Sequence, residues 1–506
     1  MSLHIDPTAT IGRVNPALHG QFIEFLGSCI DDGIWVGTDS TVPHTGGVRQ
    51  GVLDALVELQ PPVLRWPGGC YADTYRWRDG IGDPAQRPTT YNETFGTSEL
   101  DDHAFGTDEY LRLCETIGAE PWINVNMMSG SVAEMRDWME YCNRDSGTDL
   151  STLRAQNGHA DPYGVRLWGI GNEAWAGGGM MTPTSYLDEY RRYAAALPRF
   201  TASVLDAPAA YPIASGPDGN KPLERVAWTR DFFRALASFR QPPISGYDLH
   251  FYNWNIDHEN DSPTRFDEEG WDRVIQSSLE LEKVIHEQWQ LMQEGLALVP
   301  EPESSLDTKL AHVDLIVGEW GNWHRDAFYA RPALYQQVTM RDAITTALTL
   351  DILQRNCDKV SMACNAQTVN VLNSLILTEG ESTILTPNFD VFMMYKAHRG
   401  AMALTVDPVD AVSGAHAFAS VTQDGILVNL TNVHMTDDVE VELTFPSPVR
   451  LESIETLRSD EPTRFNSVEH PDAVRRSTTR LQTGDTLSHV VRLPAGSVNV
   501  VQVRTA

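Results

Sequence analysis

The chain has 506 residues, of which 42% are hydrophobic, 9% aromatic and 21% charged, as in an ordinary globular protein. Its 38 lysines and arginines against 69 aspartates and glutamates give a formal net charge of -31. Such a charge repels nucleic-acid phosphates and anionic lipid surfaces alike. We therefore expect neither nucleic acid nor membrane as a partner.

The start of the chain, MSLHIDPTATIGRVNP, lacks the basic and apolar regions of a secretory signal. No run approaches the ~18 apolar residues of a membrane span. The fifteen histidines form no HExxH motif, and the cysteines form no CxxC pair or zinc-type spacing. The cysteines are Cys29, Cys70, Cys114, Cys142, Cys357 and Cys364. We expect reduced thiols, no metal, no other cofactor and a cytoplasmic location.

From residue 20 to 395, short apolar runs suited to buried strands alternate with longer amphipathic segments. The runs are 20–26, 62–69, 120–126, 166–173, 211–217, 247–254, 315–323 and 359–370. Residues 182–197 illustrate the helices between them, because Thr182 can cap, Pro183 suits the first turn, and Tyr186 and Tyr190 repeat at helical spacing. Eight such units predict a (β/α)8 barrel rather than two or three smaller domains.

From residue 396 to 506 the pattern changes to alternating runs such as GILVNLTN and VEVELTF, separated by Pro, Gly and Asp. This pattern predicts an antiparallel β-sandwich. Residues 1–19 are expected to join that sandwich. Few polar clusters of catalytic type occur in it, so packing and assembly are its expected roles.

Active sites of such barrels form at the carboxyl ends of the strands. The residues at these ends are Glu24, Arg65, Asn126, Asn172, Glu173, His250, Tyr252, Glu319, Trp320 and Gln367. Two of the ends carry a carboxylate close to tryptophan, in RLWGIGNEAW and VGEWGNW. The residues alone leave two alternatives open. Trp320 could be a core residue, and Arg65 could serve only to hold the two carboxylates in position.

Two carboxylates facing one pocket, without a metal or nucleotide motif, are typical of glycoside hydrolysis. One protonates the leaving oxygen, and the other attacks the anomeric carbon or activates water. Aromatic faces can pack on sugar rings, while Asn, Gln, Arg and Tyr can bond hydroxyl groups. The sequence supplies both kinds of side chain.

Seven stretches make a specific resemblance. FIEFLG, LRWPGGCYAD, RWRDGIGDPAQRP, WGIGNEAW, MTPTSYLDEYRRYA, VGEWGNW and AQTVNVLNSLILT occur in this order between about residues 15 and 396. Together they are similar to glycoside hydrolase family 51, whose main activity is α-L-arabinofuranosidase. The resemblance implies an exo-acting enzyme that retains anomeric configuration. Its substrates would be arabinoxylan- or arabinan-derived oligosaccharides, and it would form a homo-oligomer, up to a hexamer.

The same resemblance implies roles for individual residues. Glu173 would be the acid/base and Glu319 the nucleophile, with Arg65 and Tyr252 as hydrogen-bond donors to Glu319. The residues expected to contact or shape the substrate are Glu24, Arg65, Cys70, Asn172, His250, Tyr252, Trp323 and Gln367. Cys70 would shape the pocket rather than act as a nucleophile.

Some positions depart from the family pattern, and rival functions stay open. The departures are in GNEAWAGGGMM, in ACNAQTVN, and at His324 and Arg325 after VGEWGNW. They leave the preference for the leaving group undecided.

The same fold and carboxylate pair would also suit a β-xylosidase, a galactofuranosidase, or an endo-acting glucanase or xylanase. A non-catalytic carbohydrate-binding protein is a third reading. A cofactor-dependent barrel is disfavoured, because Gly169 and Gly171 form no complete dinucleotide fingerprint.

Overall fold

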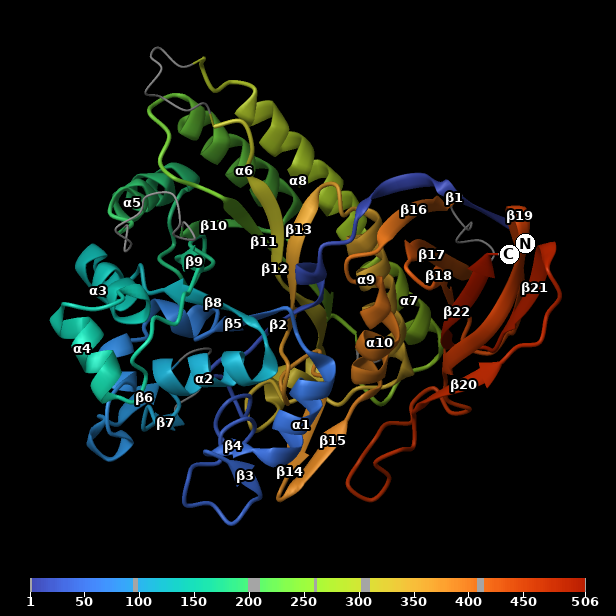
Figure 1. Cartoon of the computed structure of the whole chain (residues 1–506), viewed down its shortest axis with the longest axis horizontal. Coiled ribbons are helices and arrows are strands. Elements are labelled where there is room, and N and C mark those ends of the chain that lie inside the picture. The colour runs from blue at the N-terminus through green and yellow to red at the C-terminus, as the bar shows by residue number, and fades with distance from the viewer. Residues whose placement is uncertain are drawn as a thin grey trace.

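The computed structural model describes residues 2–93, 99–198, 210–258, 262–301, 310–406 and 414–505. A closed parallel barrel lies on one side of the molecule and a β-sheet domain on the other, with both ends of the chain beside each other at the sheet domain (Figure 1). The predicted fold class is confirmed.

All eight predicted strands form the barrel, in chain order around the ring. Their bounds are β2 (Gly20–Phe22), β5 (Val63–Trp66), β8 (Glu120–Val125), β9 (Leu167–Ile170), β10 (Tyr211–Asp218), β11 (Gly246–Asn255), β12 (Asp314–His324) and β13 (Val360–Ala366). The ring closes because β13 pairs with β2. Several predicted runs extend past the observed strands, so their last residues lie in the loops that form the mouth of the barrel.

Helices and short hairpins surround the ring of strands. The helices are α1 (Gln50–Leu59), α2 (Thr107–Ile117), α3 (Val132–Asn143), α4 (Asp149–Gln156), α5 (Pro183–Ala195), α6 (Pro222–Ala237), α7 (Glu268–Ser278), α8 (Glu280–Leu296), α9 (Met340–Arg355) and α10 (Pro387–Tyr395). The hairpins are β3–β4 (His44–Thr45, Val48–Arg49), β6–β7 (Thr90–Asn92, Glu99–Asp101) and β14–β15 (Ile376–Glu379, Ser382–Leu385). In α5 the hydroxyl of Thr182 accepts from the Ser185 amide, Pro183 opens the first turn, and Tyr186 and Tyr190 are buried, as the sequence predicts.

The second domain is a largely antiparallel sheet that folds around its own core. Its strands are β1 (Ser2–Arg13), β16 (Met402–Val406), β17 (Ala415–Thr422), β18 (Gly425–Asn432), β19 (Val439–Leu457), β20 (Arg476–Arg480), β21 (Thr486–Leu493) and β22 (Ser497–Thr505). Strand β1 pairs with β16 and with β19, which brings the start of the chain into this sheet. The division into residues 1–19, 20–395 and 396–506 stays a prediction, and these pairings support it.

Helix α9 joins the two domains. Every residue of Met340–Gln354 is buried, as expected of a helix enclosed on all sides. One side of α9 faces β12 of the barrel, and the other faces β16, β17, β18 and β22 of the sheet domain. Within the described residues, no helix is long and apolar enough to cross a membrane.

A buried polar chain crosses this junction. The Asn429 amide donates to Asp351 of α9 (2.7 Å), and its carbonyl oxygen accepts from the His398 ring (2.8 Å). Burial lowers the pKa of His398 to about 4 and raises the pKa of Asp351 to about 7. His398 is therefore neutral at pH 7, and the hydrogen bonds of Asn429 satisfy both buried groups.

Replacement of Asn429 by Ala should lower the free energy of unfolding by roughly 2–4 kcal/mol, because a buried group left unpaired costs about 1–3 kcal/mol. Urea unfolding followed by tryptophan fluorescence would measure the change. Gln423→Ala, in the exposed turn between β17 and β18, is the control and should leave stability nearly unchanged. Equal stability of the Asn429 variant and the wild type would mean that the junction does not depend on this contact.

Candidate active site

All ten residues expected at the catalytic pair and the substrate pocket lie together at the mouth of the barrel. Glu24, Asn172, Glu173 and Gln367 directly follow β2, β9 and β13, while Cys70 opens a short 3-10 helix (Cys70–Asp73) after β5. The remaining members, within strands, are Arg65, His250, Tyr252, Glu319 and Trp323. Each of the ten contacts at least one other member.

Glu319 lies in a buried, donor-rich environment. Arg65 Nη1 donates to its Oε1 (2.6 Å), and the Tyr252 hydroxyl donates to its Oε2 (2.7 Å). Burial alone would raise the pKa of Glu319, but the positive charges of His250 and Arg65 and the Tyr252 hydrogen bond outweigh it, so the pKa is lowered. Glu319 is therefore ionised at neutral pH.

Glu173 has the opposite electrostatic environment. Burial and the charge of Glu319 raise its pKa, although the hydrogen bond from His250 opposes them. His250 Nδ1 lies 2.8 Å from Oε1 of Glu173, and the Cys70 thiol lies 3.7 Å from Oε2. The backbone of Glu173 has φ +40°, a left-handed conformation that costs about 1–2 kcal/mol in a non-glycine residue. The fold sustains this cost at a residue that faces the pocket.

Asp248, which sequence reasoning missed, positions His250. One oxygen of Asp248 contacts His250 Nε2 (3.1 Å), and the other accepts the Gly318 amide (2.7 Å). Burial would lower the pKa of His250, but the charges of Glu319 and Asp248 raise it to about 10. His250 is therefore an imidazolium between carboxylates. The signal in the sequence was the alternation in YDLHFY, which puts Asp248 and His250 on the same face of β11.

One carboxylate oxygen from each of Glu173 and Glu319 and a ring nitrogen of His250 lie within 4.8 Å of one another. Atoms of these types can also ligate a metal ion. Arg65 and the protonated His250 already balance the carboxylates here. That the site works without a metal stays a prediction.

Polar atoms suited to sugar hydroxyls surround the carboxylate pair. Glu24 accepts the Gly69 amide (2.8 Å) and the Gln367 side-chain amide (2.7 Å), while Asn172 accepts from Arg65 (2.6 Å). Among the described residues, neither Asn172 Nδ2 nor Gln367 Oε1 has a hydrogen-bond partner, although both atoms are buried. Buried polar groups are rarely left unpaired, so these two atoms are the ones a bound ligand would satisfy.

Asp73 is a second residue that sequence reasoning left without a role, although it lies within LRWPGGCYAD. Its carboxylate is buried and accepts the backbone amides of Asn172 (3.2 Å) and Met127 (3.1 Å). Burial raises its pKa to about 7. Asp73 thus holds the loop that presents Asn172 and Glu173.

The site consists of two connected spaces. We call the inner recess the space lined by Glu24, Gly69, Glu319 and Gln367 and closed by Leu26, Leu334 and Leu372. We call the outer chamber the wider cavity of about 660 Å³, whose rim includes Tyr91, Met128, Trp175, Lys221 and Trp254. Both are bounded by Cys70, Glu173, Tyr252 and Trp323. A small recess therefore adjoins a chamber of a size typical for ligand binding.

Three residues singled out in the sequence lie outside these spaces. Trp320 points away from the pocket and stacks on Phe392 of α10 (6.1 Å between ring centroids), so it is a core residue. Asn126 donates to the Tyr75 carbonyl (3.0 Å) and supports a neighbouring loop. His324 is fully buried and contacts Asp342 (2.7 Å), so its contribution to the leaving-group preference is indirect.

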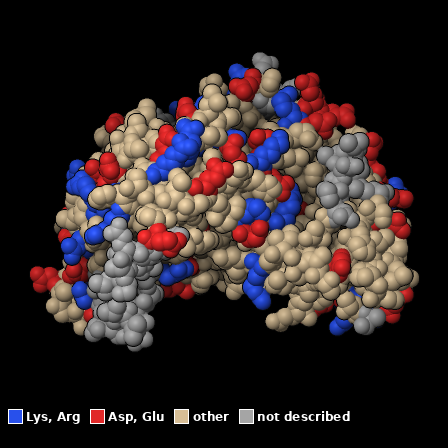
Figure 2. Space-filling view, turned by 90° about the horizontal axis from the view of Figure 1, so that it is seen from above, with Lys and Arg blue, Asp and Glu red and all other residues tan. Residues whose placement is uncertain are grey.

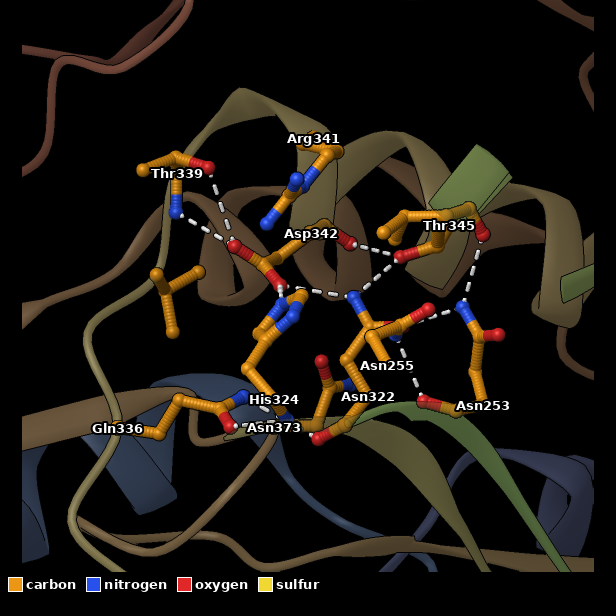
Figure 3. A network of polar contacts seen from close by, with 12 residues as sticks. Asn253, Asn255, Asn322, His324, Gln336, Thr339, Arg341, Asp342, Thr345 and Asn373 are labelled. Atoms are coloured by element: carbon orange, nitrogen blue, oxygen red, sulfur yellow. Dashed lines mark hydrogen bonds and ion pairs between the residues drawn. The ribbon is translucent and has the colours of Figure 1, made fainter. Parts of the chain in front are cut away.

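Figure 3 shows the polar network in which His324 takes part, behind the carboxyl end of β12. Asp342, in the first turn of α9, accepts from the amide and hydroxyl of Thr339, from Asn322 (2.8 Å) and from His324 (2.7 Å). Burial would raise the pKa of Asp342, but the charges of His324 and Arg341 lower it. One carboxylate thereby fixes the two residues on either side of Trp323, and with them the strand that carries Glu319.

The closed barrel and its polar, aromatic-lined pocket define the class of protein as a barrel glycoside hydrolase. Two sequence models match the chain: the "Alpha-L-arabinofuranosidase 1 domain" over residues 55–270 and the "Alpha-L-arabinofuranosidase C-terminal domain" over residues 318–497. An intracellular exo-alpha-L-arabinofuranosidase of Bacteroides ovatus is 34% identical, with 100% of this chain and 95% of the relative covered.

Solved structures agree with these sequence relatives. The arabinofuranosidase of family 51 from Xanthomonas axonopodis pv. citri is 30% identical with a TM-score of 0.87, and 99% of each chain is covered. The α-L-arabinofuranosidase of Thermotoga maritima, solved as an arabinose complex, is 25% identical with a TM-score of 0.83 and also 99% coverage of each chain. The chain therefore belongs to glycoside hydrolase family 51 and is an α-L-arabinofuranosidase.

Replacement of Asp342 by Asn should destabilise the protein by roughly 3–5 kcal/mol, as expected when one partner of a buried ion pair is removed. The new NH₂ group would face donors from Asn322 or Thr339. Activity per folded molecule should also fall, because β12 carries Glu319. Urea unfolding and initial rates on the same preparation would measure both effects.

Asp358→Asn is the matched control, because Asp358 is half exposed just after α9 and pairs only with the neighbouring Lys359 within the described residues. The Asp358 variant should change neither the free energy of unfolding nor the activity per folded molecule by much. Full stability and activity of the Asp342 variant would show that the network does not support the site.

Proposed function

We propose that the chain releases terminal α-L-arabinofuranosyl residues from oligosaccharides by double displacement, with Glu319 as nucleophile and Glu173 as acid/base. The observation that carries this proposal is the opposite direction of the two pKa shifts in glutamates whose oxygens approach within 4.8 Å. Retaining enzymes hold their carboxyl groups about 5–5.5 Å apart, whereas inverting enzymes need roughly 6.5–9.5 Å. The short approach supports retention.

In the first step, a carboxylate oxygen of Glu319 forms a bond to the anomeric carbon while the bond to the leaving oxygen breaks. Glu173 gives its proton to that oxygen, so the leaving sugar departs as an alcohol. In the second step, ionised Glu173 takes a proton from water. The water oxygen attacks the anomeric carbon, and the ester bond to Glu319 breaks.

The charges around Glu173 favour this exchange of roles. Before the first step, burial and the charge of Glu319 raise the pKa of Glu173 and so favour its protonated form. When Glu319 becomes an ester that charge disappears, while protonated His250 remains 2.8 Å from Glu173. The pKa of Glu173 then falls, so the former acid becomes a base.

The inner recess supports exo action on one terminal sugar. The recess has a volume of only about 30 Å³ and is lined in part by Leu26, Leu334 and Leu372, which leaves little space for a chain continuing beyond the cleaved residue. Asn172 Nδ2 and Gln367 Oε1 are unsatisfied atoms suited to its hydroxyl groups. The relative from Bacteroides ovatus is likewise named an exo-enzyme. Action as β-xylosidase, galactofuranosidase or endo-glycanase stays an alternative, and assays on the corresponding aryl glycosides would separate them.

The expected substrates are neutral oligosaccharides derived from arabinoxylan or arabinan. Figure 2 shows basic side chains interspersed with acidic ones, without a broad positive surface for a polyanion on that face.

Six free cysteines, together with the intracellular relative, support a cytoplasmic location. The homo-oligomer implied by the family resemblance stays a prediction.

Two catalytic variants should differ in their dependence on the leaving group. Glu319→Ala should abolish turnover of every substrate, because no covalent intermediate can form. Glu173→Ala should lose oligosaccharide cleavage but still react with an aryl arabinofuranoside whose nitrophenolate leaves without protonation. Its deglycosylation should be slow, and azide should accelerate it. Initial rates on both substrates, with and without azide, would measure this.

The product of the azide reaction distinguishes the roles. With Glu173→Ala, azide attacks the covalent intermediate, so the glycosyl azide should keep the α-configuration of the substrate. With Glu319→Ala, azide replaces the nucleophile and should give the opposite anomer. Circular dichroism and thermal unfolding would establish that both variants fold. Near-normal oligosaccharide cleavage by Glu173→Ala, or an inverted azide product from it, would contradict the assignment.

The pH dependence of kcat/KM should be bell-shaped. Activity should fall at acidic pH as Glu319 becomes protonated, at a pH below the ordinary carboxyl pKa, and at alkaline pH as Glu173 loses its proton, above that value. Tyr252→Phe removes a hydrogen bond that lowers the pKa of Glu319, so its acidic limb should move to higher pH. The alkaline limb serves as the internal control. An acidic limb that stays in place would mean that it does not report on Glu319.

A further inference from the structure

Three leucines line the inner recess beside its polar residues. They are Leu26, Leu334 and Leu372, and all three are buried. Leu26 follows β2, Leu334 lies in the connection after β12, and Leu372 follows β13, and these three strands are neighbours in the ring. We call the three residues the leucine wall. Their side chains have no hydrogen-bonding atom, so a ligand hydroxyl placed against them finds no partner there.

Two members of the wall have a strained backbone. Leu334 has φ +55° and Leu372 has φ +52°. The left-handed conformation is costly for a residue with a Cβ atom, and leucine lacks the short polar side chain with which Asn or Asp offsets the cost. Such residues persist only where their surroundings hold them, and they cluster at ligand sites. A leucine that merely filled the core would not need this conformation.

Hydrogen bonds hold the strained pair in place. The Leu372 amide donates to the Leu334 carbonyl (3.1 Å). The buried side-chain amide of Gln336 donates to the backbone carbonyls of Leu372 and Asn322 (both 3.2 Å). The side-chain oxygen of Gln336 accepts the His324 amide (2.8 Å). The wall is therefore fixed to β12, and in a closely packed interior it cannot easily move aside for a larger ligand.

The turn that carries Leu26 packs directly on the loop that carries Leu334. A Cβ atom at Gly27 would lie 2.2 Å from the Ala333 carbonyl oxygen. The two backbones therefore touch, and only glycine fits between them. The Leu26 amide donates to the Glu24 carbonyl (2.9 Å). The third leucine is thus held against the other two and beside a polar residue of the recess.

The position of Glu173 indicates which part of a terminal sugar faces the wall. Glu173 follows β9, which lies opposite β13 in the ring of strands. The leaving oxygen must approach Glu173 to receive its proton, so the rest of the terminal sugar extends toward β13 and β2. In arabinofuranose the exocyclic carbon C5 projects from C4, away from the anomeric carbon. The hydroxymethyl group at C5 would therefore point toward the leucine wall.

β-D-Galactofuranose is a demanding test of such a wall. Its ring has the same configuration as that of α-L-arabinofuranose, and it differs only by one more hydroxymethyl group, which is attached to C5. The recess has a volume of only about 30 Å³, which leaves little room for this group. Its hydroxyl would also be buried against leucine without a hydrogen bond, which is unfavourable.

We propose that the leucine wall excludes the additional hydroxymethyl group of a hexofuranose, so that the inner recess accepts a terminal arabinofuranose and rejects a terminal galactofuranose. This rests on the proposed function. It assigns to Leu26, Leu334 and Leu372 a part in specificity and leaves the chemistry to the two glutamates.

The experiment compares 4-nitrophenyl α-L-arabinofuranoside with 4-nitrophenyl β-D-galactofuranoside, which share the leaving group and the ring configuration. For the wild type, kcat/KM should be about a hundredfold higher on the arabinofuranoside, as expected for one extra group in a closed pocket. In Leu334→Ala and in Leu372→Ala this ratio should fall about tenfold. The fall should come mainly from a higher kcat/KM on the galactofuranoside, because a truncated wall leaves space for its C5 substituent.

Two further variants separate specificity from stability. Leu334→Gly also opens the wall, and glycine accepts φ +55° without strain. Its thermal stability should therefore be at least that of Leu334→Ala, and its substrate ratio should fall similarly, which keeps the test available if the alanine variant does not fold. Leu375→Ala is the matched control, because Leu375 is buried in the loop of Leu372 but does not border the recess. It should lower thermal stability and leave the ratio unchanged.

An unchanged ratio in folded Leu334→Gly and Leu372→Ala would overturn the inference, and so would wild-type protein that hydrolyses both glycosides equally well. A ratio that fell only through loss of arabinofuranoside hydrolysis would also count against it, since the leucines would then support the site in general. Failure of the proposed function is a separate outcome, because wild-type protein would then hydrolyse neither glycoside.

Discussion

The buried ion pair between Arg65 and Glu319 is the interaction on which the rest of the site depends. Both side chains are almost inaccessible to water, so each charge would be costly without the other. The same guanidinium also donates to Asn172, and one rigid group thus spaces Glu319 and the residue beside Glu173. Arg65 alone does not balance the negative charge of the site, because Glu24, Glu173 and Asp248 are also acidic and buried. Protonated His250 supplies a second positive charge, and the raised pKa values of Glu24 and Glu173 reduce the negative charge that remains. The division of labour between the two glutamates follows from this charge balance.

Support for that balance reaches well beyond the pocket. Asp342 fixes the end of β12 from one end of α9, and Asp351, about two and a half turns later on the same helix, accepts a hydrogen bond from Asn429 of the sheet domain. A helix enclosed on every side has little freedom to shift, because protein interiors are closely packed. The sheet domain therefore contributes to the site, although none of its described residues lines the pocket. It covers the helix that holds the strand of Glu319.

The sequence allowed the barrel and the pocket residues to be predicted because both depend on local patterns. Eight apolar runs predict eight strands, and polar residues at their ends converge once the strands are parallel. For Trp320 the sequence left two positions open, in the core or in the pocket. Alternation along β12 sends Glu319 inward and Trp320 outward, and the choice between the two was clear only once the strand was known. Asp73 could not be assigned from sequence, since it acts through the backbone amides of Asn172 and Met127, which are distant in the chain. Asp248 was missed although the alternation in YDLHFY places it on the same face as His250. Their importance is a matter of three-dimensional contact.

The alternation that places Trp320 in the core also organises the pocket by depth. From His250 onward, alternate residues of β11 border the pocket, so one strand carries His250 beside Glu173, Tyr252 beside Glu319 and Trp254 at the rim. Residues near the bottom are constrained by buried charges, and a change there alters the chemistry. A residue at the rim is partly hydrated and bonded to few neighbours, so it can vary at little cost to stability. Variation in leaving-group preference is therefore expected at the upper end of the strands, while the carboxylate pair below stays fixed. The unusual His324 fits this division, because it acts from behind the strand and touches neither the bottom nor the rim of the pocket.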